Sequence, residues 1–310
     1  MGTLRLKMPP RRILATRGGA MGDFIVTLPS LSALRKAFPE AHLALLAHPA
    51  HAALAAADGL CDESRSLESA GLAPFFSPQG KPGDDWRTWM GSFDLVVSWL
   101  ADEDGMFQKN ARASGAGEFL QGPWKFEGSQ PVALQLAEAL TPLGIEIESP
   151  NYPFRFCHRS QKDVLAIHPG SGSVRKNWPA SQWRTLLAEW HRLHPQSGML
   201  IITGEAESEE AVALPAQLRA AGIPCEHSHG LSLTGLCHLL AGSRLYLGHD
   251  TGISHLAAAC GVPCRLIFGP ASPAIWIPPA PNVEVFRTTN LSDLAPAEFL
   301  AWLRSTSGPS

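Results

Sequence analysis

Short apolar segments alternate with longer amphipathic stretches along most of this chain. Residues 12–16, 42–47 and 164–168 are segments of the first kind, and a helical pattern begins soon after each of them. This alternation is typical of parallel βαβ units, in which a helix joins one strand to the next. The sequence therefore predicts an α/β protein built on parallel sheets.

A polar segment near the middle of the chain interrupts the alternation. Residues 148–156 (ESPNYPFRF) contain two prolines and no helical period, and the pattern restarts after them. We therefore predict an interdomain linker there, with one α/β domain over residues 1–150 and a second over residues 151–310. Because open parallel sheets bind ligands beyond the carboxyl ends of their strands, the space between two facing domains is the expected ligand site.

Within the first domain, the pattern predicts long helices over residues 24–38 and 131–144. Residues 102–128 are rich in glycine and carry scattered aromatic residues, which predicts a long loop. Such a loop inside a compact domain is either mobile or functional.

Composition narrows the class of protein. A hydrophobic fraction of 45% with 17% charged residues describes a soluble globular protein, and the net charge of −3 gives no reason to expect a nucleic-acid partner. The six cysteines contain no Cys-x-x-Cys pair, and no segment is apolar over the roughly 18 residues of a membrane span. We therefore predict a cytoplasmic protein with reduced thiols, whose membrane contact would be peripheral. The segment CEHSH at residues 225–229 alternates possible ligands, but we predict no metal site.

Three loops place glycine and polar residues between a predicted strand and a predicted helix. The first is RGGAMGD at residues 17–23, whose glycines would let backbone amides approach a ligand closely. It fits neither a Walker loop nor the G-x-G-x-x-G pattern. Asp23 opens the following helix, where an aspartate is either an N-cap or a functional acid.

The second loop, HPGSGSVRKNWP at residues 168–179, combines small hydrogen-bond donors such as Ser171 with the cation of Lys176. The N-terminus of a helix attracts anions, so these residues indicate a phosphate or diphosphate, with an ordinary glycine-rich turn as the alternative. The third loop, HDTGISH at residues 249–255, would place Thr251 and Gly252 at a helix start and His255 on its first turn. A bound phosphate explains this set, but Asp250 as an N-cap and His255 as a core histidine are alternatives.

The three segments together resemble glycosyltransferase family 9, the ADP-heptose:lipopolysaccharide heptosyltransferases, in the family's order and over about residues 12–278. The resemblance implies a GT-B fold, with two Rossmann-like domains facing across a cleft. The N-terminal domain would bind the acceptor and the C-terminal domain the nucleotide sugar. It also implies an inverting, metal-independent transfer of heptose from ADP-heptose, without a cofactor, to an anionic glycolipid of the lipopolysaccharide core or a related glycoconjugate.

The resemblance also assigns residues. Asp23 matches the aspartate proposed as general base in the family, and Lys176 matches the lysine that contacts the donor diphosphate. For the glutamate that binds the ribose, Glu207 fits best and Glu205 is the alternative. The expected donor-binding residues are Ser171, Lys176, Glu207, Asp250, Thr251, Gly252 and His255, and the expected acceptor-binding residues are Arg17 and Gly22. His249 departs from the family pattern, in which asparagine is common.

Two other functions use the same fold. A GT-B sugar-nucleotide epimerase would act on the donor without an acceptor. A non-catalytic nucleotide-sugar-binding protein would keep the donor loops and lose turnover. The presence of both Asp23 and Lys176 argues against the non-catalytic protein. Product formation without an acceptor would indicate the epimerase.

Overall fold

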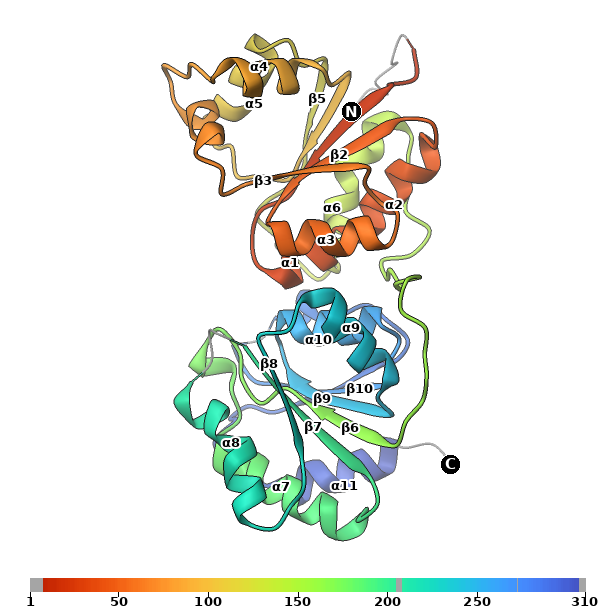
Figure 1. Ribbon diagram of the computed structural model, residues 1–310, viewed down its shortest axis with the longest axis vertical. Helices are drawn as coiled ribbons and strands as arrows, with labels where there is room; N and C mark the ends of the chain where they lie inside the picture. The colour runs from red at the N-terminus through yellow and green to blue at the C-terminus, as the bar shows by residue number, and fades with distance from the viewer. Residues whose placement is uncertain (1–7, 205–207, 272, 307–310) are drawn as a thin grey trace. The chain divides into compact units, whose positions relative to one another are not determined.

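The computed structural model describes residues 8–204, 208–271 and 273–306. The chain forms two compact units, and the boundary between them in the sequence lies between Tyr152 and Pro153. Each unit is built around one parallel β-sheet that carries helices on both faces (Figure 1).

The N-terminal unit contains a five-stranded sheet of order β3-β2-β1-β4-β5. Every neighbouring pair of its strands is parallel. Its strands are β1 (Arg12–Thr16), β2 (His42–Ala47), β3 (Glu63–Ser66), β4 (Leu95–Ser98) and β5 (Glu118–Gln121). Its α-helices are α1 (Met21–Ile25), α2 (Leu28–Ala37), α3 (Pro49–Ala57), α4 (Asp84–Gly91), α5 (Met106–Ala113) and α6 (Val132–Ala137). Figure 1 shows α4 and α5 on one face of this sheet and α2 and α6 on the other.

The C-terminal unit contains a six-stranded sheet of order β11-β10-β9-β6-β7-β8, again with parallel pairs throughout. Its strands are β6 (Val164–Ile167), β7 (Gly198–Thr203), β8 (Glu226–His229), β9 (Leu245–His249), β10 (Cys264–Phe268) and β11 (Val283–Arg287). Its α-helices are α7 (Ala180–Leu193), α8 (Glu209–Ala220), α9 (Leu233–Gly242), α10 (Gly252–Ala259) and α11 (Pro296–Thr306). In Figure 1, α7, α8 and α11 cover one face of the sheet and α9 and α10 the other.

Both sheets reverse their winding direction once. In the N-terminal unit the chain runs outward from β1 to β3 and then returns to the other side of β1 for β4 and β5. In the C-terminal unit it runs from β6 to β8 and returns beside β6 for β9, β10 and β11. At such a switch point the two loops that follow the central strands separate, and open α/β sheets bind ligands there. The two switch points lie between β1 and β4 and between β6 and β9.

The central strands are apolar because helices cover both of their faces. In β1, Ile13, Leu14 and Ala15 are fully buried. Leu14 belongs to a core with Trp89 and Phe107. Buried strands of this kind fix the backbone from which the switch-point loops emerge.

The predicted long helices are each interrupted in the structure. The helix predicted over residues 24–38 begins earlier, at Met21, and is divided into α1 and α2. Pro29 lies in the first turn of α2, where its missing N–H is tolerated. The helix predicted over residues 131–144 turns into a 3-10 helix at Glu138–Leu143, which contains Pro142.

The prediction of a long loop over residues 102–128 was wrong, because this segment contains α5 and β5. The carboxylate of Asp102 accepts hydrogen bonds from the amides of Phe107 and Gln108, at 2.9 Å each, and so caps the start of α5. The glycines in this segment favoured the prediction of a loop. The ends of α5 and β5 are instead fixed by side-chain contacts and by pairing with β4.

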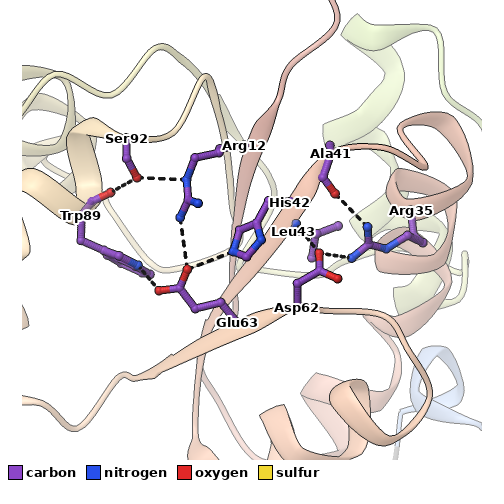
Figure 2. A network of polar contacts seen from close by, with 9 residues as sticks. All are labelled: Arg12, Arg35, Ala41, His42, Leu43, Asp62, Glu63, Trp89 and Ser92. Carbon is purple, nitrogen blue, oxygen red and sulfur yellow. Dashed lines mark hydrogen bonds and ion pairs between the residues drawn. The ribbon is translucent and has the colours of Figure 1, made fainter.

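A network of polar contacts fastens the amino ends of three strands in the N-terminal unit (Figure 2). Glu63 begins β3, and its Oε2 accepts from Arg12 Nη2 at 3.1 Å and lies 3.0 Å from His42 Nε2. Trp89 Nε1 donates to the other oxygen of Glu63 at 2.5 Å. Arg12 and His42 begin β1 and β2. One carboxylate therefore holds three strands and α4 together.

The second carboxylate of this network, that of Asp62, lies at the same end of the sheet. Asp62 Oδ2 accepts from Arg35 Nη2 at 2.6 Å and from the amide of Leu43 at 2.7 Å. Arg35 also donates to the carbonyl oxygen of Ala41 at 2.8 Å. These contacts attach α2 to the start of β2, at the end of the sheet opposite to the switch-point loops (Figure 2).

The ionised form of Glu63 stabilises the fold. Burial alone would raise the pKa of Glu63, but hydrogen bonds from His42, Trp89 and Arg12 outweigh it, and the pKa is lowered. Since the pKa is lower in the folded chain, this stabilisation is fully present above the unfolded pKa and is lost as the pH falls through the folded one.

We predict that Glu63→Gln lowers the free energy of unfolding by about 2 kcal/mol at neutral pH, because an amide donor then faces the donors of the network. The difference from the wild type should shrink below about pH 4.5. Urea unfolding over a pH series measures it, with Glu118→Gln at an exposed position of β5 as the control. A difference that stays constant with pH would contradict the assignment.

Candidate functional site

The loops that follow β6 and β9 lie side by side because these strands are neighbours in the sheet. Lys176 ends a 3-10 turn in the first loop, and Asp250 directly follows β9. Lys176 Nζ donates to Asp250 Oδ2 at 2.7 Å, although the residues are 74 positions apart. The structure therefore brings two of the predicted donor-binding residues together at the switch point of the C-terminal unit.

This ion pair is asymmetric in its exposure. The side chain of Asp250 is 7% exposed and that of Lys176 is 30% exposed. A lysine ammonium has three N–H donors, and the bond to Asp250 uses one of them. Asp250 thus fixes the position of a cation that can still bind an anion from solution.

A second contact between the same loops is buried in the protein. The backbone N–H of Trp178 donates to His249 Nε2 at 2.9 Å. His249 is fully buried, and its ring lies 5.3 Å from that of Trp183, edge to face. Burial, assisted by the neighbouring His168, lowers the pKa of His249 to about 3, so the ring is neutral and accepts this hydrogen bond. The residue that departs from the family pattern therefore fastens the two loops to each other.

Thr251 is the N-cap of α10, which begins at Gly252. Its hydroxyl oxygen accepts a hydrogen bond from the amide of Ser254 at 3.3 Å. The alternative interpretation of Asp250 as the N-cap was wrong, since Asp250 precedes the cap and pairs with Lys176. The first N–H groups of a helix have no partner within it and carry the positive end of its dipole. His255 lies buried on the first turn, as expected for a core histidine or a ligand contact.

The hydroxyl of Ser171 is used within its own loop. It lies 2.8 Å from the carbonyl oxygen of Ser173 and 2.5 Å from Asn177 Oδ1, and it accepts from the amide of Ser173 at 3.2 Å. Ser171 therefore shapes the loop that carries Lys176, and donor binding by its hydroxyl stays a prediction. Glu205 and Glu207, the candidates for ribose binding, lie outside the described residues.

Asp23 lies at the switch point of the N-terminal unit. It is the third residue of α1, and the interpretation of Asp23 as an N-cap was wrong because Ala20 holds that position. Asp23 Oδ2 accepts a hydrogen bond from the amide of Ala20 at 2.9 Å. This is the contact that an acid at the third helical position makes to the N-cap residue in a capping box. Asp23 Oδ1 accepts from Arg17 Nη2 at 3.1 Å.

Arg17 is buried beside Asp23. Its Nη1 donates to the carbonyl oxygen of Trp99, which directly follows β4, at 3.3 Å. Burial lowers the pKa of Arg17, while the charge of Asp23 raises it. Gly22 lies inside α1, and its carbonyl accepts from the amide of Val26 at 3.1 Å. Acceptor binding by Arg17 and Gly22 stays a prediction.

Residues 226–229 of the segment CEHSH form β8. His227 Nε2 and His229 Nδ1 lie 2.7 and 3.0 Å from the hydroxyl oxygen of Thr203 on the neighbouring strand β7. Across residues 8–204, 208–271 and 273–306, no group of three or more His, Cys, Asp or Glu side chains is arranged to hold a metal ion. In the same part of the chain, no helix combines the length and apolar character needed to cross a membrane.

The loop motifs in the sequence contain Lys176 and Asp250, but they do not indicate which residues hold the two loops together. The roles of Trp178 and His249 depend on a contact between segments about 70 residues apart, which no local pattern records.

The family model described as glycosyltransferase family 9 (heptosyltransferase) matches residues 129–297. The chain is 40% identical over 110 residues to lipopolysaccharide heptosyltransferase 1 of Pseudomonas aeruginosa, covering 36% of this chain and 29% of that protein. It is 34% identical over 101 residues to lipopolysaccharide heptosyltransferase 1 of Escherichia coli K12, covering 32% of this chain and 30% of that protein. The matched segment thus spans less than a third of each of these relatives.

Solved structures of the family share the fold over nearly the full length. The structure titled E. coli heptosyltransferase WaaC with ADP has a TM-score of 0.76 at 17% identity, covering 95% of this chain and 99% of that one. A glycosyltransferase family 9 protein from Veillonella parvula DSM 2008 has a TM-score of 0.75 at 15% identity, covering 95% and 96%. The predicted α/β class and GT-B fold are confirmed. Because the family model covers more than half of the 310 residues, this chain belongs to glycosyltransferase family 9.

Proposed function

We propose that this protein transfers heptose from ADP-heptose to a hydroxyl group of the lipopolysaccharide core or of a related anionic glycolipid, with inversion at the sugar carbon. The matched relatives are lipopolysaccharide heptosyltransferases, and WaaC was solved with ADP and with ADP-2-deoxy-2-fluoro heptose. The observation that carries the proposal is the Lys176–Asp250 pair at the start of α10, at a switch point of the sheet.

The donor side of this site suits a diphosphate. Negative charge builds on the departing ADP as the sugar–oxygen bond breaks. Lys176 supplies a fixed positive charge, and Thr251 and Gly252 supply the N–H end of α10. Donors that are held in place before the reaction stabilise such charge without reorganising, which is an effective form of catalysis.

The acceptor side needs a base. In the proposed step, a carboxylate oxygen of Asp23 takes the proton from the acceptor hydroxyl. The acceptor oxygen forms a bond to the anomeric carbon, and the bond from that carbon to the phosphate oxygen breaks. The electron pair leaves with ADP. Attack on the face opposite to the leaving group inverts the configuration through an oxocarbenium-like transition state.

The remaining assignments belong to the same proposal. Ser171, His255 and Glu207 would complete the donor site, and Arg17 and Gly22 would lie on the acceptor side. No cofactor is required, because the nucleotide sugar is itself a substrate. The proposal places the protein in the cytoplasm, in peripheral contact with the membrane that carries the glycolipid.

The test of the reaction class is incubation with ADP-heptose, with and without heptose-free lipopolysaccharide. We expect ADP release that depends on the acceptor, together with heptose in the lipopolysaccharide. Conversion of ADP-heptose without any acceptor would instead indicate an epimerase. Binding of ADP without turnover on any acceptor would indicate a non-catalytic nucleotide-sugar-binding protein.

We predict that Asp23→Ala lowers kcat by a factor of about 10² to 10⁴, the range that general-base catalysis supplies, while ADP binding persists. Steady-state ADP release and calorimetric titration with ADP measure the two quantities. Asp84→Ala removes an exposed carboxylate at the start of α4 and should leave kcat unchanged. Wild-type turnover in the Asp23 variant would remove the proposed base.

We predict that Lys176→Ala weakens ADP binding by about tenfold or more, because a charge-assisted contact is lost and Asp250 then stands unpaired near the diphosphate. Isothermal titration with ADP gives the dissociation constant. The exposed Lys162 is the matched control, and Lys162→Ala should bind ADP like the wild type. An unaltered dissociation constant in the Lys176 variant would refute its role.

We predict that dialysis against EDTA leaves the rate of transfer unchanged, because Lys176 and the start of α10 take the place of a cation in this proposal. The measurement compares initial rates before dialysis, after dialysis and after addition of divalent metal ions. A rate that falls on dialysis and returns with a metal ion would show that the reaction uses one.

A further inference from the structure

Arg17 and Asp23 differ in how far they reach solvent. The side chain of Arg17 is 5% exposed, whereas that of Asp23 is 29% exposed. The guanidinium group therefore lies on the buried side of the carboxylate, away from the surface. A cation in this position is poorly placed to contact an acceptor and well placed to act on Asp23.

We propose that Arg17 is a positioning residue for Asp23, and that Gly19 provides the space this arrangement needs. This inference rests on the proposed function, in which Asp23 is the base. It assigns to Arg17 a different role from the acceptor contact that the family resemblance implied.

Arg17 holds Asp23 at two points. Its Nη2 donates to the carboxylate Oδ1 at 3.1 Å, and its Nε donates to the backbone carbonyl of the same residue at 3.1 Å. A third bond, from Nη1 to the carbonyl oxygen of Trp99, anchors the guanidinium to the end of β4. The planar guanidinium group thus fixes the main chain and the side chain of Asp23 relative to the end of β4.

Two neighbouring residues complete this hold on Asp23. The amide of Ala20 donates to Oδ2 at 2.9 Å, and the hydroxyl of Thr27 donates to the backbone carbonyl at 2.8 Å. Each carboxylate oxygen therefore has one fixed donor. Since each oxygen can accept more than one hydrogen bond, the exposed part of the carboxylate can still take a proton from a substrate hydroxyl.

Gly19 faces this carboxylate directly. Its φ is +90°, a conformation that side chains rarely adopt, and a Cβ atom built there would lie 2.8 Å from both Cγ and Oδ2 of Asp23. Any other residue at position 19 would push the carboxylate away from Arg17 and Ala20. The glycine is thus explained by the position of Asp23.

The energetics favour a role beyond simple folding. Burial of a cation is costly unless the cation is paired and hydrogen-bonded. A misplacement of about 1 Å at a reacting group can cost about 10² in rate. A buried guanidinium that holds the acid at two atoms, and is itself anchored to the end of β4, is suited to prevent such a misplacement.

The chain offers a matched control on the same strand. Arg12 begins β1 and Arg17 directly follows its last residue, and each pairs with a carboxylate. Arg12 pairs with Glu63 at 3.1 Å, in the network at the opposite end of the sheet (Figure 2). Arg12→Ala therefore removes an arginine–carboxylate pair of the same 3.1 Å length, at a more exposed position, without touching the loop of Asp23.

The experiment compares Arg17→Ala, Arg17→Lys and Arg12→Ala in the heptose-transfer assay, with and without low-millimolar guanidinium chloride. We expect Arg17→Ala to lower kcat about 100-fold with unchanged acceptor KM and unchanged ADP binding. Added guanidinium should restore much of this loss, because it refills the emptied site. Arg17→Lys should retain more activity than Arg17→Ala, and Arg12→Ala should match the wild type with no response to guanidinium.

Three results would overturn the inference: wild-type kcat in Arg17→Ala, a change confined to the acceptor KM, or no rescue by guanidinium in a variant that still binds ADP. If Arg17→Ala does not fold, Gly19→Ala carries the test, since it keeps Arg17 and should lower kcat without rescue. Wild-type kcat in that variant would likewise contradict the inference. Wild-type turnover in Asp23→Ala would instead contradict the proposed function, in which Asp23 is the base.

Discussion

The contact between the loops after β6 and β9 is the constraint on which the proposed donor site depends. The sheet reverses its winding between these strands, so two segments about 70 residues apart in the sequence emerge side by side. The ion pair of Lys176 with Asp250 and the hydrogen bond from Trp178 to His249 then hold the segments together. The contact between Trp178 and His249 is buried, and His249 is neutral. The ion pair therefore presents the ammonium group of Lys176 at a fixed place near the start of α10.

The N-terminal unit uses the same principle with the charges exchanged. Its reversal lies between β1 and β4, and the bridging residue is the buried cation Arg17, which connects the end of β4 to Asp23. One unit thus presents a cation held by a buried acid, and the other presents an acid held by a buried cation. In the proposed glycosyl transfer, the cation would stabilise the leaving diphosphate and the carboxylate would take the acceptor proton.

The α/β class and the main strands of both units could be predicted from the sequence, because buried parallel strands leave continuous apolar runs. The short elements α5 and β5 could not, since their ends depend on the Asp102 carboxylate and on pairing with β4. The same limit applies to the site. The loop motifs singled out Asp23, Lys176 and Asp250, but the pairing of Lys176 with Asp250 and the bond from Trp178 to His249 are tertiary contacts that no local pattern records.

The most direct test of the donor site is a crystal structure of the protein with ADP. We expect the diphosphate to lie against Lys176 and the backbone amides at Thr251 and Gly252. A diphosphate bound away from residues 250–255, with Lys176 still paired to Asp250 and in contact with no phosphate oxygen, would contradict it.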